Sequence, residues 1–151
     1  MERRALYLYL SCELRLTRAE VRKLPGDICA PEDLLNLPDS FLDTLPPGLQ
    51  HKLEQLPDTA AQLSAALREI EEALYIRRIR FLTAEDTDWP ERFSTLEDPP
   101  LWLYLRGELP AEYTPTVAMI GSRNASSYGL RMADFIAAEL AAKGVSIVSG
   151  L

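Results

Sequence analysis

Residues 117–129 of the chain are VAMIGSRNASSYG, an apolar segment followed by a loop of small residues and then by the start of a helical pattern. A strand that leads through such a loop into a helix directs the free backbone N–H groups of the helix N-terminus at one point in space. That point attracts phosphate. Arg123 lies within the loop and can hold the same anion with its planar fork of donors. The segment therefore predicts both a local fold and an anion site.

The residues on either side of this loop complete a β-α-β pattern. We expect a strand over 116–120, a helix over 128–143 and a second strand over 145–148, with Gly144 as the left-handed residue that ends the helix. Two apolar strands joined by a helix of this length predict parallel pairing with a right-handed crossover. Two strands and one helix cannot cover both faces of a parallel sheet, so we expect a truncated sheet and a chain that is part of a longer protein.

The second strand ends at Ser149 and Gly150, and parallel pairing would bring these residues near Gly121 and Ser122. Small residues let a phosphate approach the backbone closely, and serine hydroxyls donate hydrogen bonds without bulk. The spacing matches neither a P-loop nor the G-x-G-x-x-G fingerprint. The alternative interpretation is an ordinary β-α turn, with Ser126 or Ser127 as the helix N-cap and a solvated Arg123.

Residues 5–74 predict several short helices separated by proline and glycine. Thr17 is a candidate N-cap, and Glu20 would complete a capping box. The clearest helix is expected from about residue 59 to about residue 77, with a shared apolar face formed by Leu63, Leu67, Ile70 and Leu74. We therefore expect a compact all-helical domain over 1–74, and over 75–115 a connecting segment of strand and turn that leads into the sheet.

Charge and composition narrow the class of protein. The net charge of −7 lies entirely within residues 1–110, whereas residues 111–151 carry three basic and three acidic side chains. An anion site is therefore expected only in the C-terminal part. No apolar run is long enough to span a membrane, so we expect a cytoplasmic protein in which Cys12 and Cys29 are free thiols. No paired carboxylates, metal-ligand cluster or nucleophile–base pair is evident, which predicts no catalysis, no metal and no cofactor.

A basic run and three aromatic residues lie between the helical region and the β-α-β pattern. Residues 77–80 are RRIR, which we interpret as a solvated helix end with cations placed favourably at its C-terminus. Trp89, Trp102 and Tyr104 could stack on nucleic-acid bases or pack inside the fold.

Several segments together resemble the DNA-processing protein A family (DprA, also called Smf). They are WP at 89–90, DPPLWLYLRG at 98–107, VAMIGSR at 117–123, SYG at 127–129 and IVSGL at 147–151. The resemblance covers residues 78–151. Residues 5–74 are similar only in length and general sequence pattern to the sterile-alpha-motif-like (SAM-like) N-terminal domain of that family. The family usually has Tyr-Pro where this chain has Trp89-Pro90, and it continues beyond Leu151 with further strands and a basic segment.

The resemblance implies an α/β protein in which a small SAM-like helical domain precedes the start of a Rossmann-like parallel sheet. It also implies binding of single-stranded DNA, natural transformation (competence), loading of the RecA recombinase and a homodimer of the full-length protein. By this resemblance Gly121, Ser122 and Arg123 would line the phosphate pocket, Ser149 and Gly150 would close it, and Ser127 would cap the nearby helix.

We therefore expect a non-catalytic DNA-binding recombination mediator, present as its N-terminal portion and without a membrane partner. One alternative is a Rossmann-like nucleotide-phosphate hydrolase, whose catalytic glutamate and arginine would lie later in the chain. Another is a protein-interaction module, since the acidity of the helical region suits a basic partner.

Overall fold

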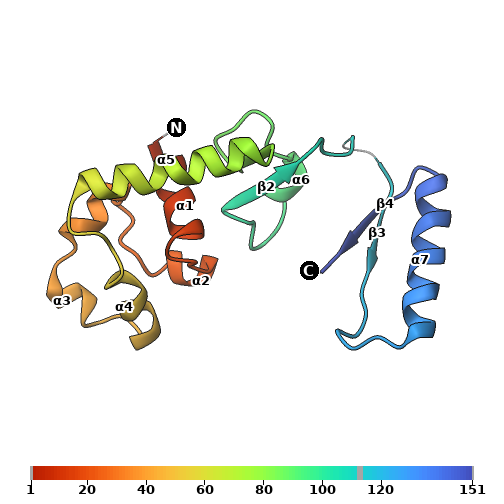
Figure 1. The fold of residues 1–151 in the computed structure, drawn as a ribbon, viewed down its shortest axis with the longest axis horizontal. Coiled ribbons are helices and arrows are strands. Elements are labelled where there is room, and N and C mark those ends of the chain that lie inside the picture. The colour runs from red at the N-terminus through yellow and green to blue at the C-terminus, as the bar shows by residue number, and fades with distance from the viewer. Residues whose placement is uncertain (1, 112–113, 151) are drawn as a thin grey trace. The chain divides into compact units, whose positions relative to one another are not determined.

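A computed structural model describes residues 2–111 and 114–150, which form two compact α/β units, Met1–Gly107 and Glu108–Leu151. Unit 1 contains α1 (Glu2–Cys12), α2 (Arg18–Val21), a 3-10 helix η1 (Pro31–Asn36), α3 (Asp39–Leu42), α4 (Pro47–Leu53), α5 (Ala60–Ile76), β1 (Ile79–Thr83), α6 (Glu91–Ser94) and β2 (Trp102–Arg106). Unit 2 contains β3 (Thr116–Met119), α7 (Ser127–Ala142) and β4 (Ser146–Ser149) (Figure 1).

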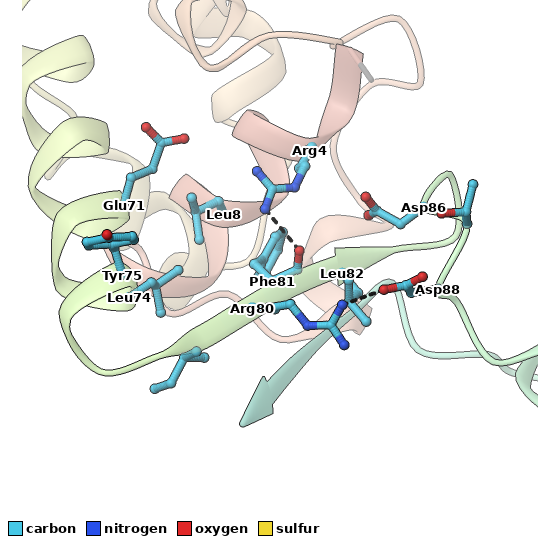
Figure 2. A pocket seen from close by; sticks show the side chains of 12 residues that line it. Arg4, Leu8, Glu71, Leu74, Tyr75, Arg80, Phe81, Leu82, Asp86 and Asp88 are labelled. Atoms are coloured by element: carbon cyan, nitrogen blue, oxygen red, sulfur yellow. Dashed lines mark hydrogen bonds and ion pairs between the residues drawn. The ribbon is translucent and has the colours of Figure 1, made fainter. Parts of the chain in front are cut away.

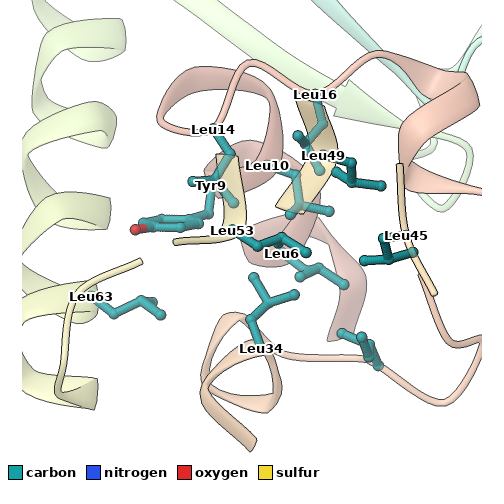
Figure 3. Close-up of a cluster of buried hydrophobic side chains, with 11 residues drawn as sticks. Leu6, Tyr9, Leu10, Leu14, Leu16, Leu34, Leu45, Leu49, Leu53 and Leu63 are labelled. Atoms are coloured by element: carbon teal, nitrogen blue, oxygen red, sulfur yellow. The ribbon is translucent and has the colours of Figure 1, made fainter. Parts of the chain in front are cut away.

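The helices of unit 1 enclose one apolar core (Figure 3). Leu10 from α1 and Leu63 from α5 are completely buried, and Leu49 from α4 is 1% exposed. The other buried members of this core are Leu6, Tyr9, Leu14, Leu16, Ile28, Leu34, Leu45 and Leu53. Leucines spaced along several short helices thus bury one another, which accounts for a stable fold in helices that would be marginal alone.

Hydroxyl caps fix two helix starts where the sequence predicts them. The Thr17 side chain accepts a hydrogen bond from Glu20 N, and the Glu20 carboxylate accepts one from Thr17 N at 2.7 Å, so the predicted capping box is confirmed. The Thr59 side chain caps α5 by accepting a hydrogen bond from Gln62 N, and α5 ends with Arg77 as its C-cap residue. The expected span of the longest helix is therefore confirmed within one residue at each end.

The antiparallel pair of strands β1 and β2, called the hairpin below although α6 lies between them in the chain, packs against the helices. The two strands are antiparallel, and Phe81 lies opposite Tyr104. Phe81 is 1% exposed and forms a second small core with Leu8 of α1 and Ile70 of α5. Of residues 75–115, which we expect to connect the helical domain to the sheet, those up to Gly107 belong to unit 1. The reason is Phe81, whose apolar surface is buried against helices that precede it.

Three aromatic side chains of this region pack against other rings. Trp102 lies 5.9 Å from Tyr7 between ring centroids, and Tyr104 lies 5.2 Å from Phe81. Trp89 contacts Phe93 at 5.8 Å. Of the two interpretations of these aromatic residues, the structure favours packing against other side chains of unit 1, although Tyr104 remains 45% exposed.

Unit 2 is a β-α-β unit. Strands β3 and β4 are parallel, as expected, and Gly144 adopts a φ of +76° directly after the helix C-cap, which confirms its predicted role. The strands are slightly displaced from the predicted ranges, because Ile120 and Val145 lie outside them. Glu112 and Tyr113 of the expected connector, and Leu151 at the end of the resemblance, lie outside the described residues.

Candidate nucleic-acid interface

The register of the parallel pair brings two loops to one edge of the sheet. Met119 lies opposite Ser149. Both strands therefore end at the same level, and Gly121 follows β3 by one residue while Gly150 follows β4 directly. In open α/β sheets, ligands bind outside the carboxyl ends of the strands. The adjacency of the two strands, on which the predicted site depends, is confirmed.

The predicted loop residues are accessible. Gly121, Ser122 and Arg123 after β3, and Ser149 and Gly150 at the end of β4, are all exposed. A Cβ atom added to Gly121 or to Gly150 would meet nothing within 4 Å, and neither residue has a positive φ. Neither packing nor backbone conformation requires glycine at these two positions. Open space over the backbone is the condition for close approach of a ligand.

The Ser122 hydroxyl shapes the loop. Its Oγ accepts a hydrogen bond from Asn124 N at 3.2 Å, in an arrangement typical of a serine turn. The hydroxyl proton is still available for donation to an anion, because the oxygen acts only as an acceptor in this bond.

The cap of α7 is Ser126. Its Oγ accepts a hydrogen bond from Gly129 N at 3.1 Å, and Ser127 is the first helical residue. The capping role that the resemblance implies for Ser127 is therefore wrong. Two adjacent serines compete for the position, and Ser126 has the extended backbone, with φ −68° and ψ 160°, that an N-cap needs.

This cap leaves donors at the start of α7. The first N–H groups of a helix have no intrahelical acceptor, and Ser126 satisfies only that of Gly129. In the described part of the chain, the N–H groups of Ser127 and Tyr128 have no hydrogen-bond partner. Together with the positive end of the macrodipole, these donors make the start of α7 a favourable place for an anion. Ser127 offers its backbone N–H and its exposed hydroxyl at this helix start.

Arg123 supplies positive charge in a stretch of sequence without carboxylates. Its side chain is exposed and has no hydrogen bond or ion pair within residues 2–111 and 114–150. Residues 114–133 contain no aspartate or glutamate, and their only charges are those of Arg123 and Arg131. The local charge is therefore positive although the whole chain is acidic.

Tyr128 is a further candidate residue at this position, which the sequence reasoning did not include. It lies in the first turn of α7, and its side chain is 66% exposed. A flat ring beside a phosphate-binding loop can stack on a base. The available signal was an aromatic residue at the first position of the predicted helix, where a core-facing residue is not required.

Comparison with known proteins gives one family. Residues 80–151 match the model of the family described as DNA recombination-mediator protein A. No curated protein and no solved structure matches the chain. None of the helices in the described ranges is long and apolar enough to cross a membrane.

Proposed function

We propose that the chain, whose residues 80–151 match the model of the DNA recombination-mediator protein A family, binds single-stranded DNA at the strand-end loops of unit 2. In this proposal unit 1 corresponds to a SAM-like domain and unit 2 to the beginning of a Rossmann-like sheet. The protein acts without catalysis in DNA processing for recombination and transformation. Its partners are single-stranded DNA, RecA and, in the full-length protein, a second copy of itself.

One observation supports this proposal above the others. The parallel register places Met119 opposite Ser149, so the loop that carries Arg123 and the exposed Gly150 leave the sheet at one edge. The free N–H groups at the start of α7 follow the same loop. A guanidinium, backbone amides and serine hydroxyls in one region, without nearby carboxylates, match the oxygens of a phosphate.

The chemistry of these groups predicts how DNA is bound. Amides, hydroxyls and a guanidinium contact phosphate and sugar, which carry no sequence information. Binding should therefore be largely independent of sequence and should weaken as salt increases, because each neutralised phosphate releases counterions. The exposed ring of Tyr128 adds a stacking contact that every base can use.

Substitution of Arg123 by alanine tests the assignment. We expect weaker binding of a single strand and a decrease of about 0.7 to 1 in the slope of log affinity against log salt concentration, because one phosphate contact is lost. Arg131→Ala is the matched control, since Arg131 is also exposed but lies within α7. Filter binding across a salt titration measures both quantities. Equal slopes for wild type and Arg123→Ala would show that Arg123 does not contact DNA.

A further inference from the structure

The C-terminal end of α5 exposes two large apolar side chains. Tyr75 is 85% exposed and Ile76 is 70% exposed. The Tyr75 ring makes no aromatic contact and its hydroxyl makes no hydrogen bond with any residue that the structure describes. In contrast, Trp89, Trp102 and Tyr104 of the same unit pack against other rings. Folding of unit 1 therefore does not account for an aromatic residue at position 75.

Two exposed arginines follow these side chains directly. Arg77 is the C-cap of α5, and its Nη1 donates to Ala73 O at 3.3 Å, as expected for a cation at a helix end. Arg78 has a φ of +53°, a left-handed conformation that glycine adopts at lower cost. The Arg78 side chain has no partner within the described ranges.

An open pocket of about 580 Å³ lies beside Tyr75 (Figure 2). Its apolar lining comes from Leu8, Leu74, Ile79, Phe81 and Leu82. The cations that line the pocket are engaged, because Arg80 pairs with Asp88 and Arg4 donates to Phe81 O at 3.0 Å. Glu71 and Asp86 add negative charge to the lining, so the pocket itself excludes phosphate.

We propose that this end of α5, comprising Tyr75, Ile76, Arg77 and Arg78, is a second contact for single-stranded DNA. The proposal rests on the function proposed above. A base stacks on the Tyr75 ring next to the apolar pocket, and the phosphates pair with Arg77 and Arg78. A single strand alternates uncharged bases with charged phosphates, which fits a surface with an aromatic ring and adjoining arginines. Exocyclic amino groups of bases donate hydrogen bonds to carboxylates, so Glu71 and Asp86 are compatible with a base, whereas they repel an acidic peptide.

Substitutions in the 151-residue chain distinguish the contribution of base stacking to DNA affinity from the contribution of charge. We expect Tyr75→Ala to weaken binding of a fluorescein-labelled single strand of mixed sequence about five-fold to a hundred-fold at every salt concentration, because base–aromatic stacking is lost. Tyr75→Phe keeps the ring and should bind as wild type does. Arg78→Ala should lower the salt slope by about 0.7, and Arg68→Ala, an exposed arginine on the same helix, should leave it unchanged. Fluorescence anisotropy measures affinity, and circular dichroism verifies folding of each variant.

The outcomes separate this contact from the loop site of unit 2. If Arg123→Ala weakens binding and Tyr75→Ala does not, the second contact is overturned and the proposed function stands. If Tyr75→Ala weakens binding and Arg123→Ala does not, the second contact stands and the loop site fails. A wild-type chain that binds no single strand overturns both. If Tyr75→Ala abolishes binding of a glutamate-rich peptide while DNA binding is unchanged, the surface contacts a protein and the proposal is overturned.

Discussion

The hydroxyl of Tyr104 lies 3.0 Å from the thiol of Cys12 and also 2.6 Å from Ser11 Oγ, so the middle of β2 is hydrogen bonded to the end of α1. Partial burial and the hydrogen bond with Cys12 raise the pKa of Tyr104 above its usual value. The phenol therefore remains protonated at neutral pH and keeps its donor. These bonds join residues more than ninety positions apart, and they connect the hairpin to the helical core.

Replacing Tyr104 with phenylalanine should destabilise unit 1 by about 1 kcal/mol, because the hydrogen bonds to α1 are lost while the ring is kept. Urea unfolding followed by tryptophan fluorescence measures the change, since Trp89 and Trp102 both lie in unit 1. Tyr75→Phe is the control, as the exposed Tyr75 hydroxyl has no partner among the described residues. Equal losses in the two variants would mean that the Tyr104 hydroxyl contributes nothing.

The Asp33 carboxylate should stabilise unit 1 at neutral pH, and this contribution should be lost in acid. Its Oδ2 accepts hydrogen bonds from Ala30 N at 2.8 Å and from Cys29 N at 2.9 Å, and these bonds lower the pKa of the carboxyl. A pKa that is lower in the folded chain than in the unfolded chain adds stability above the unfolded value of about 3.9, and this stability is lost as the pH falls through the folded value.

Asp33→Asn should therefore be less stable than wild type at pH 7, and the difference should close as the pH falls below about 4. Urea unfolding over a pH series measures it. Asp27→Asn serves as the control, because the exposed Asp27 has no hydrogen bond or ion pair in the described ranges. A difference for Asp33→Asn that is constant with pH would contradict the role given to this carboxylate.

Two glycines of unit 2 should respond differently to alanine. Gly144 has a φ of +76°, so Gly144→Ala should destabilise the end of α7 by about 1 kcal/mol. Gly121 has open space around its Cβ position and no positive φ, so Gly121→Ala should leave stability unchanged and weaken DNA binding. Amide hydrogen exchange of α7, combined with anisotropy on a labelled single strand, distinguishes the two effects. Unchanged DNA binding by Gly121→Ala would remove this glycine from the proposed site.

The two adjacent serines at the start of α7 separate an effect on helix stability from an effect on DNA binding. Ser126→Ala removes the cap and should destabilise α7 by about 1 kcal/mol, seen as faster amide exchange in its first turn. Ser127→Ala leaves the cap intact and should reduce DNA affinity with little change in exchange. Faster exchange in Ser127→Ala than in Ser126→Ala would contradict the observed cap.

Local patterns account for most of what the sequence predicts correctly. The apolar period and Thr59 define α5, the Thr17–Glu20 spacing defines a capping box, and the apolar strands on either side of the 3.6-residue pattern define the parallel pair. The prediction that the ends of β3 and β4 lie close together is also correct. Each of these predictions depends on residues that are close in sequence or on a general rule of chain crossover.

Longer-range features were not predictable in the same way. The contact of Phe81 with Leu8 joins residues that are far apart in the chain, so no periodicity predicts it. The choice of Ser126 over Ser127 as N-cap depends on the backbone angles of two neighbours with the same side chain. Exposure of Tyr128 depends on which face of α7 contacts the strands, and that orientation is set by tertiary packing.

The burial of Phe81 also determines where the chain can be truncated. The segment that matches the family begins at Arg80, but the next side chain is covered by α1 and α5. A fragment that starts there would present an uncovered apolar hairpin to solvent and should aggregate. The helices are thus a folding scaffold for the part of this segment up to Gly107, and soluble truncations should end after Gly107 or retain both parts.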